Sequence, residues 1–524
     1  HPVGPYKPLS AWFGMDEANY ATTALGGKLL RELHDLSPVP VFIRSHHLLT
    51  SGDGVPELKW SSTNVYTEDA QGHPVYDFKI LDGIFDAYKA AGVQPLVELG
   101  FMPKDLASGA GDYQVHFPGN TTGGTVQSPP KDYAKWRELV RRVVAHLVRR
   151  YGAATVRGWY FEVWNEPDIS YWHGTPQEYW KLYDYAVAGV RTALPGARVG
   201  GPATTSPSDA KGRNFLAGFL DHVAHGKSAA TGGAVQLDFI SFHAKGAPHI
   251  AGRVVQMGLQ HELDDADSGF ALIGKYPTLR HLPIIISEAD PEGCAACSSK
   301  MNPANDYRNG TLYPAYTAAA YKSLFALQDR HNSNLIAMLS WSFEFEGRDY
   351  FEGFRSLASN GIDKPILNFF RMAGLMRGAR VAVNSDGAVP LDSILTGGVR
   401  GAPDIDALAT IALHQAAVMA WNYHDDAAAA PASPVVIAIH GLPKGATRLL
   451  VMQYRIDDSH SNAYSAWKAL GSPQSPTPEQ YALLERKGGL ELAGSPLWMT
   501  AKDGAVQVPE ILPRQSVSLL LLRW

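Results

Sequence analysis

The sequence predicts an α/β protein: a (β/α)8 TIM barrel followed by a C-terminal antiparallel β-sandwich. Over roughly the first 375 residues, short apolar segments alternate with longer amphipathic helical segments, which is typical of parallel βα units. After about residue 380, Ala-rich apolar stretches alternate instead with Gly, Pro and Asp turns, as in antiparallel sandwiches. We therefore expect a barrel over residues 1–378 and an accessory sandwich over residues 379–524, with the extreme N-terminus free to join the sandwich.

Eight apolar segments of the first part are expected to form the barrel strands, one for each βα unit. A doubly wound open sheet is an alternative arrangement of the same elements, but eight units fit a closed barrel better. The expected strands span residues 11–13, 41–45, 94–99, 158–164, 198–201, 237–242, 284–288 and 335–341.

Two helices between these strands carry clear start signals. Thr175-Pro176-Gln177-Glu178 forms a capping-box pattern with Pro at the first helical position, and apolar residues follow it at helical spacing. Asp132 is expected to cap a second helix, whose single apolar stripe ends at Gly152.

The second part of the chain contains five expected sandwich strands. The segment 454–467 lies among them, but it is too rich in side-chain hydrogen-bonding groups for a plain core strand. We expect it to be a long loop that packs back on the barrel. The expected strands span residues 407–413, 416–423, 435–440, 448–454 and 516–522.

The composition is that of an ordinary globular protein, with 45% hydrophobic and 19% charged residues. The net charge of −5 provides no basic surface for a polyanion, which argues against nucleic acid as a partner. No apolar run reaches the roughly 18–20 residues of a membrane span, since His414-Gln415 breaks the longest candidate. The chain begins His1-Pro2-Val3 without Met, so either an export signal has been removed or the sequence has been trimmed, and of the two we expect a periplasmic or secreted protein.

The only two cysteines, Cys294 and Cys297, form a C-x-x-C pair. Such a pair can form a local disulfide, stay as two free thiols, act in redox chemistry or supply half of a zinc site. No second cysteine pair completes a four-cysteine zinc site, and the surrounding loop lacks a thioredoxin-like strand and helix. We therefore expect a local disulfide or two free thiols.

Two strand ends carry the same arrangement of polar residues. Glu166 follows an apolar, aromatic-rich segment, and Pro167 stops the strand directly after it. Glu288 ends a second apolar segment, which Pro291 closes. In a barrel, these carboxylates lie at the ends of strands four and seven, where they can point across the same mouth. Two such carboxylates are what hydrolysis of a glycosidic bond requires.

These motifs resemble those of the retaining glycoside hydrolases that share this barrel, and most closely glycoside hydrolase family 39, which contains β-xylosidases and α-L-iduronidases. The likeness extends over most of the chain. The Asn-Glu-Pro element is shared by several barrel hydrolase families, whereas its combination with the Ser-His-Ser-Asn-Ala-Tyr run is far more specific. The segments that carry the resemblance are 43–46, 158–168, 200–202, 238–243, 287–290 and 457–467.

The resemblance implies that Glu166 is the general acid/base and Glu288 the nucleophile, with retention of anomeric configuration. The chemistry of the residues agrees with this division. Desolvation in an aromatic-walled site keeps one carboxyl protonated, whereas Arg44 and other donors keep the other ionised. The alternative is that either glutamate merely pairs with an arginine at the barrel mouth.

The resemblance also implies residues that bind the sugar: Asn165 as a donor to the 2-hydroxyl and Trp341 as the aromatic floor. Asn165 could instead stabilise the strand end, and Trp341 could be core. His46 and His243 are expected to contact sugar hydroxyls or to support the carboxylates, or else to be satisfied core histidines.

Glu344 or Glu346, after the last strand, would add a further hydroxyl contact, and the sequence does not fix which of them faces inward. No metal site is expected, because the adjacent residues His46 and His47 would face opposite ways in a strand. We expect no cofactor and a small carbohydrate as the partner, and the sequence predicts no oligomeric state.

The identity of the sugar depends on a few positions. Lys245, in a His-Ala-Lys-Gly run, resembles the iduronidase lysine that meets the uronate carboxylate, although an exposed lysine after a strand is an equal alternative. Against a uronate, the iduronidase pattern has a histidine at the position of Ile80, and the loop at Gly293-Cys294 also differs. We therefore expect a β-xylosidase that releases xylose from short xylo-oligosaccharides, with side activity on α-L-arabinosides.

Two other functions stay open: an α-L-iduronidase-like uronide hydrolase, and a protein that binds carbohydrate without cleaving it. The presence of both Glu166 and Glu288 together with Asn165 argues against the second. A phosphate-binding barrel is excluded, because no Gly-rich anion loop follows strand seven or eight.

Overall fold

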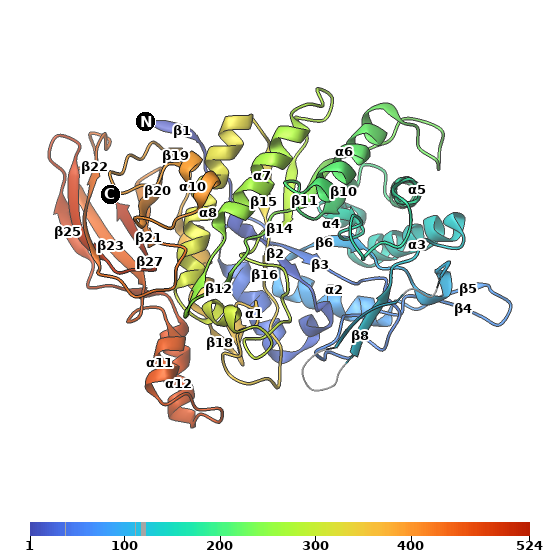
Figure 1. Cartoon of the computed structure of the whole chain (residues 1–524), viewed down its shortest axis with the longest axis horizontal. Coiled ribbons are helices and arrows are strands. Elements are labelled where there is room, and N and C mark those ends of the chain that lie inside the picture. The colour runs from blue at the N-terminus through green and yellow to red at the C-terminus, as the bar shows by residue number, and fades with distance from the viewer. Residues whose placement is uncertain (37, 110–111, 117–121) are drawn as a thin grey trace.

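The computed structural model describes residues 1–36, 38–109, 112–116 and 122–524. A barrel with its covering helices fills one part of the molecule, and antiparallel strands formed by the C-terminal residues pack against one side of it (Figure 1). Both chain ends lie on the side of these C-terminal strands.

The barrel is a parallel sheet that closes on itself. Strands that are neighbours in the barrel also follow one another along the chain. The ring is completed by β16, which pairs with β2, where Ser340 lies opposite Phe13. Leu339 interrupts the last strand, so β15 and β16 together fill the eighth position. This ring confirms the predicted (β/α)8 barrel. Its strands are β2 (Trp12–Met15), β3 (Phe42–Ser45), β6 (Gln94–Leu99), β9 (Tyr160–Val163), β10 (Arg198–Thr204), β11 (Phe239–His243), β14 (Ile284–Glu288), β15 (Leu335–Met338) and β16 (Ser340–Trp341).

The barrel strands are mostly apolar because both of their faces are covered. Successive side chains point into the barrel and toward the helices, so a strand without a solvated face has no polar alternation. Ile284, Ile285 and Ile286 of β14 are all fully buried. Polar groups are therefore concentrated where the strands end.

Helices follow the strands and cover the barrel. The predicted capping box is present: Thr175 accepts a hydrogen bond from the N–H of Glu178 at 3.2 Å, and the Glu178 carboxylate accepts one from the N–H of Thr175 at 2.7 Å. Asp132 also caps its helix as predicted. No helix of the described residues is long and apolar enough to cross a membrane. The helices are α1 (Ala24–Asp35), α2 (Lys79–Ala91), α3 (Tyr133–Tyr151), α4 (Ala153–Arg157), α5 (Pro176–Ala193), α6 (Ala210–His225), α7 (Leu259–Ile273), α8 (Leu312–His331) and α9 (Pro365–Leu375).

Short elements decorate the loops of the barrel. Antiparallel hairpins are formed by β4 (Tyr66–Glu68) with β5 (Pro74–Tyr76), β7 (Asp112–His116) with β8 (Thr122–Val126), β12 (His249–Ala251) with β13 (Val254–Gln256), and β17 (Ala358–Ser359) with β18 (Ile362–Asp363). Short 3-10 helices span η1 (Leu9–Ala11), η2 (Ala18–Thr22), η3 (Lys104–Leu106) and η4 (Pro303–Asn309).

Two antiparallel sheets make up the C-terminal sandwich. The larger sheet contains β1, β19, β20, β21, β27, β23 and β24 in that order, with β25 also on β23, and the smaller one pairs β22 with β26. All five predicted strands are present, and β19, β24, β25 and β26 are additional ones. The bounds are β1 (Pro2–Pro5), β19 (Ala379–Val381), β20 (Asp404–Ala412), β21 (Gln415–Tyr423), β22 (Ser433–Ile439), β23 (Arg448–Ile456), β24 (Glu491–Leu492), β25 (Leu497–Thr500), β26 (Val506–Leu512) and β27 (Ser516–Arg523).

The central strands of the larger sheet are buried on both faces, and their side chains alternate between two cores. On β21, Ala417 and Met419 belong to the cluster that includes the barrel core, whereas Ala416 and Val418 belong to the core between the two sheets. The N-terminal strand β1 pairs with β19 at the edge of this sheet. The domain boundary proposed between residues 378 and 379 falls at the start of β19, and the independent folding of the two parts stays a prediction.

The segment 454–467 differs from its prediction as a loop. It begins in β23, turns, and enters the helix α11 (Ala463–Ala469), because the side chain of Asn462 caps this helix by accepting from the N–H of Ser465. Trp467 packs on Phe351 of the barrel part, so the predicted contact with the barrel is present. Two further helices of this region are α10 (Leu391–Gly397) and α12 (Pro478–Gly488).

Candidate active site

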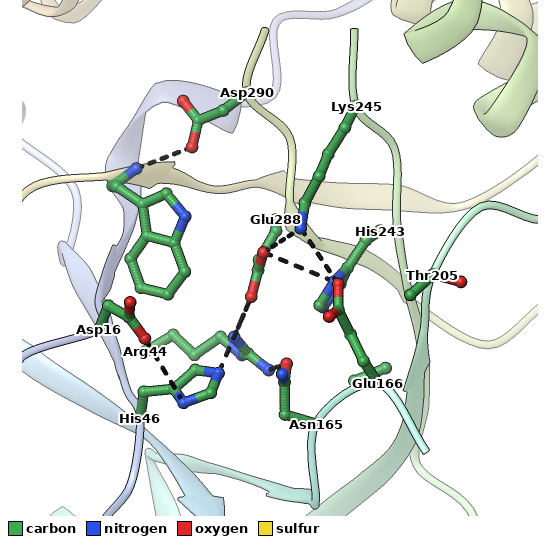
Figure 2. Close-up of polar contacts among 12 residues, drawn as sticks. Asp16, Arg44, His46, Asn165, Glu166, Thr205, His243, Lys245, Glu288 and Asp290 are labelled. Carbon is green, nitrogen blue, oxygen red and sulfur yellow. Dashed lines mark hydrogen bonds and ion pairs between the residues drawn. The ribbon is translucent and has the colours of Figure 1, made fainter. Parts of the chain in front are cut away.

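Glu166 lies just beyond β9, in a turn at the carboxyl end of the barrel. Its backbone is in the left-handed region, with a φ of 45°, which a non-glycine residue adopts only where its surroundings hold it. Its N–H donates to the carbonyl of Ala203 in β10 at 2.9 Å. This turn brings the side chain to His243 and Lys245 (Figure 2).

Glu288 is the last residue of β14 and lies close to Glu166. One carboxylate oxygen of each glutamate and one ring nitrogen of His243 lie within 4.8 Å of one another. His243 ends β11, and its Nδ1 lies 2.8 Å from Glu166 Oε1 and 3.6 Å from Glu288 Oε2. The two glutamate side chains are 9% and 6% exposed, so they are desolvated and still accessible from the barrel mouth.

Arg44, in β3, holds the cluster together from a fully buried position. Its guanidinium donates to Glu288 Oε1 at 3.1 Å and to the amide oxygen of Asn165 at 2.9 Å. It also pairs with Glu162 of β9 at 2.5 Å and with Glu98 of β6 at 2.8 Å. The planar fork of arginine thus fixes groups from three other strands, and it leaves the NH2 group of Asn165 as a donor.

Lys245 follows β11, and its ammonium lies between the two glutamates (Figure 2). Nζ is 2.5 Å from Glu288 Oε2 and 3.1 Å from Glu166 Oε1. The side chain is 20% exposed, and Asp265 accepts a hydrogen bond from its backbone N–H at 3.3 Å. The alternative of an exposed lysine after the strand is therefore excluded, because Lys245 belongs to the carboxylate cluster.

The cations of the cluster set the charge of both glutamates. Burial raises the pKa of Glu288, but His243, Lys245 and Arg44 outweigh burial and hold that pKa well below its usual value. Burial also raises the pKa of Glu166, yet Lys245 and His243 hold it below its usual value. The expectation that desolvation keeps Glu166 protonated is wrong for this arrangement, because a lysine and a histidine contact its carboxylate.

His46 and His47 follow β3 and turn toward the same side. His47 has a φ of 60°, and the centres of the two rings lie 4.1 Å apart. Asp16 Oδ1 lies 3.6 Å from His46 Nδ1 and 3.3 Å from His47 Nε2. The expectation that these histidines face opposite ways is wrong, because β3 ends at Ser45 and strand alternation ends with it.

Two groups in the described part of the chain have the donor atoms and spacing of a cation site: Asp16 with His46 and His47, and His243 with the two glutamates. His46 also lies 3.4 Å from Glu98 and 3.9 Å from Glu288 through Nε2. Burial, and then the nearby His47, hold the pKa of His46 well below its usual value, so this ring is neutral.

Trp341 ends β16, and its ring lies 5.9 Å from the ring of His46 between centres. Its backbone N–H donates to Asp290 at 3.0 Å. The guanidinium of Arg355 lies 5.4 Å from the centre of the indole. Arg355 is 1% exposed, and within the described residues none of its guanidinium nitrogens makes a hydrogen bond, although Nε lies 3.5 Å from Asp290. The aromatic ring therefore lies against a buried cation.

Glu344 and Glu346 lie beyond the end of β16 and contact backbone groups. Glu344 accepts from the N–H of Gly361 at 2.5 Å, and burial raises its pKa to about 7. Glu346 accepts from the N–H of Leu25, at the start of α1, at 2.9 Å. The structure does not bring either carboxylate to the two catalytic candidates, because the strand alternation that would point one of them inward ends at Trp341. Their role as sugar contacts stays a prediction.

Cys294 and Cys297 form a disulfide in the loop after β14, one of the two expected outcomes. Arg308 donates to the carbonyl of each cysteine at 2.9 Å. The carbonyl of Ala295, inside the disulfide loop, accepts from the backbone N–H of Arg355 at 3.1 Å. The disulfide loop thus supports the segment that carries the buried arginine.

Four charged residues of the site lie outside the sequence prediction: Asp16, Glu98, Glu162 and Arg355. Glu98 and Glu162 are single charges inside apolar strands, and this is a signal that the sequence does contain. Asp16 directly follows β2, so it could have been found as a strand-end residue. Arg355 lies in a loop, and no pattern in the sequence marks it.

Barrels place catalysis at the carboxyl ends of their strands, and two carboxylates this close together are suited to cleaving glycosidic bonds. The fold and the site thus define the class of glycoside hydrolases. The sequence profile described as Glycosyl hydrolases family 39 matches residues 55–488, and the chain belongs to this family.

Several relatives are similar along most of the chain. A β-xylosidase of Geobacillus stearothermophilus is 28% identical over 508 residues, which span 91% of this chain and 85% of the relative. The α-L-iduronidase of Homo sapiens is 27% identical over 460 residues, or 82% of this chain and 64% of the relative. The crystal structure of a monomeric β-xylosidase from Caulobacter crescentus CB15 has a TM-score of 0.76 at 21% identity, and the match covers 100% of this chain and 97% of that one. This last likeness supports the fold.

Proposed function

We propose that the protein is a retaining glycosidase in which Glu166 is the general acid/base and Glu288 the nucleophile. The observation that carries this proposal is the approach of the two carboxylates, whose nearest ligand oxygens lie within 4.8 Å. Retaining enzymes separate these groups by about 5–5.5 Å, whereas inverting enzymes leave about 6.5–9.5 Å for a water molecule. The spacing therefore favours direct attack on the anomeric carbon.

The surroundings of the two glutamates support this division of roles. Glu288 contacts Arg44 as well as Lys245, and these cations hold its pKa well below its usual value although burial raises it. Glu288 is therefore better suited than Glu166 to act as the ionised nucleophile. Glu166 has no contact with the permanent cation Arg44 among the described contacts. It can donate a proton to the leaving oxygen and later accept one from water.

Neighbouring side chains would bind the sugar. The amide oxygen of Asn165 accepts from Arg44, so its NH2 group is the group that would donate to a sugar, and a bond to the 2-hydroxyl strengthens at an oxocarbenium-like transition state. Trp341 would supply the apolar floor. His46 and His243 contact the glutamates and would hold them in place.

We further propose that the substrate is the terminal β-xyloside of short xylo-oligosaccharides, with side activity on α-L-arabinosides. The Geobacillus relative named as a β-xylosidase aligns over 91% of this chain and 85% of its own length, whereas this chain spans only 64% of human α-L-iduronidase. The lysine is compatible with a neutral sugar, because Lys245 has two carboxylate partners within the protein.

A uronide hydrolase is a second candidate, favoured by the two cations at the site. Arg355 is buried without a hydrogen bond to its guanidinium in the described residues, and its charge acts on Lys245. A buried cation without hydrogen bonds is costly, and a substrate carboxylate would supply the missing acceptor.

A panel of aryl glycosides tests these proposals: β-D-xyloside, α-L-arabinopyranoside, β-D-glucoside and α-L-iduronide, with the native enzyme and Lys245→Ala, each at its own pH optimum. We expect the highest kcat/KM on the xyloside and little change of its KM in the variant. A preference for the iduronide that falls by about 2 kcal/mol in Lys245→Ala would favour the second candidate. No turnover of any member would contradict the glycosidase proposal and favour a carbohydrate-binding protein.

A further inference from the structure

The ammonium of Lys245 occupies the place where a glycoside has to react. Its Nζ contacts Glu166 Oε1 at 3.1 Å and Glu288 Oε2 at 2.5 Å. The other oxygen of Glu288 accepts from Arg44 at 3.1 Å, so Oε2 is the oxygen on the side of Glu166. An anomeric carbon in contact with Glu288, and a leaving oxygen in contact with Glu166, need the space that this ammonium fills.

We propose that glycoside binding displaces the Lys245 ammonium from between Glu166 and Glu288, so that the lysine acts as a removable counter-ion that ties protonation of Glu166 to the binding of a sugar. This inference rests on the proposed function, in which these glutamates are the acid/base and the nucleophile.

Hydrogen bonds fix the backbone of Lys245, whereas the described contacts of its side chain are those of the terminal ammonium. Asp265 accepts from the Lys245 N–H at 3.3 Å, and the N–H of Gly246 donates to the carbonyl of Asp290 at 3.2 Å. Among the described contacts, the ammonium has the two glutamates as its partners. Rotation about the four bonds of the lysine stem therefore releases the ammonium without moving the chain.

Arg44 is the contrasting cation of the same cluster. Its guanidinium is fully buried and is held by Glu98 and Glu162 in addition to Glu288. Leaving the cluster would strand those carboxylates without a partner. Arg44 is therefore the permanent counter-ion of the nucleophile, and Lys245 the removable one.

Displacement changes the balance of charge at Glu166. While the ammonium is in place, Lys245 and His243 oppose the effect of burial and favour the ionised form of Glu166, which cannot act as an acid. Once the ammonium leaves, the charge of Glu288 within 4.8 Å disfavours a second charge, and Glu166 takes up a proton from solvent. Other titratable or charged groups also act on Glu166, Glu288 and Lys245. These are Asp168, His46, Glu98, Arg44, Asp265 and Arg355.

The pH dependence of two kinetic constants tests displacement, because kcat/KM reports the free enzyme and kcat reports the complex. The substrate is phenyl β-xyloside, whose poor leaving group requires the acid. In Lys245→Met we expect both limbs of the kcat/KM profile to move up by about one pH unit, while the limbs of the kcat profile stay where they are in the native enzyme.

Two other variants serve as references. Lys245→Arg keeps a cation and should leave the kcat/KM limbs near the native positions. Lys300→Met removes an exposed lysine that pairs with Asp349, and it should change neither profile.

Equal shifts of kcat and kcat/KM in Lys245→Met would mean that the ammonium stays between the glutamates in the complex, and would overturn the inference. The absence of any shift would overturn it as well. These outcomes leave the proposed function intact, whereas the absence of turnover on both xyloside and iduronide would remove the proposed function and the inference with it.

A measurement on the native enzyme avoids any folding defect of the variants. S-linked thioxylobiose, which is not hydrolysed, is titrated calorimetrically in buffers of different ionisation enthalpy at about pH 6. Displacement predicts the uptake of up to about one proton per site on binding. Binding without proton uptake contradicts it, and an absence of binding counts against the xyloside as substrate.

Discussion

The carboxylate of Asp290 accepts a hydrogen bond from the backbone N–H of Trp341 at 3.0 Å. Asp290 follows Glu288 in the chain and also accepts from the hydroxyl of Ser340 at 2.9 Å and from Tyr313. The residues directly after the proposed nucleophile thereby fix the strand that ends in the proposed sugar platform.

Replacing Asp290 with Ala should destabilise the fold and weaken sugar binding together. Three buried donors would lose their acceptor, so we expect a loss of about 3 kcal/mol or more in unfolding free energy and a raised KM. Denaturant unfolding and steady-state kinetics measure these effects. Asp290→Asn, which keeps an acceptor oxygen, should lose less, and Asp349→Ala, at an exposed ion pair, should lose little. An Asp290→Ala enzyme with native stability and KM would refute this role.

Glu166→Ala should slow poor leaving groups far more than good ones. A dinitrophenolate leaves without protonation, whereas a phenolate or a sugar needs the acid, so the loss in kcat/KM should grow with the pKa of the leaving group. Rates across a series of aryl xylosides measure this slope. The matched control is Glu138→Gln, since this carboxylate pairs with Arg141 on the surface of α3. A uniform loss across the series would show that Glu166 is not the acid.

The pH profile of kcat/KM should be bell-shaped with its maximum on the acidic side of neutrality. The rising limb belongs to ionisation of Glu288, whose pKa is held well below its usual value against the effect of burial, chiefly by His243 and Lys245. The falling limb belongs to loss of the Glu166 proton, and that pKa is also lowered, because Lys245 and His243 outweigh burial. Activity therefore declines as the pH rises through the pKa of Glu166. A falling limb above about pH 7 would contradict the contacts of Lys245.

Much of the fold follows from short-range patterns that a barrel enforces. Strands with two covered faces are mostly apolar, and they end where polar residues and prolines begin, as at Glu166-Pro167. The helices were predictable from caps at Asp132 and Thr175, which satisfy local N–H groups. The helix at Ala463–Ala469 was not, because its start depends on the single cap Asn462 in a segment otherwise rich in turn residues.

Only the site residues that lie in strands or at strand ends were predictable from the sequence. Glu166, Glu288, His243 and Arg44 lie in or next to strands, and the structure brings them together as the topology requires. The protonation of Glu166 was not predictable, because it depends on where the flexible side chain of Lys245 places its charge. Arg355 was missed because it lies in a loop that follows no period. The contacts of Glu344 and Glu346 with backbone groups were not predictable either, because strand alternation ends before these residues.

Chelation should leave activity unchanged, even though Asp16, His46 and His47 bring three donor atoms together. The proposed reaction uses carboxylates alone, so no step requires a metal ion. Incubation with EDTA followed by a xyloside assay checks this. A loss of activity that zinc restores, and that His47→Asn abolishes, would show instead that this group holds a functional metal.

The most direct test of the central claim is identification of the residue that forms the glycosyl-enzyme intermediate. The enzyme is inactivated with 2,4-dinitrophenyl 2-deoxy-2-fluoro-β-xyloside, digested, and analysed by peptide mass spectrometry, with Glu288→Ala treated in parallel. The electron-withdrawing fluorine slows the second step, so the covalent intermediate accumulates. We predict a single fluoroxylosyl label on Glu288 and none in the variant. A label on Glu166 or on any other residue, or the same labelling in Glu288→Ala, would contradict the proposed mechanism.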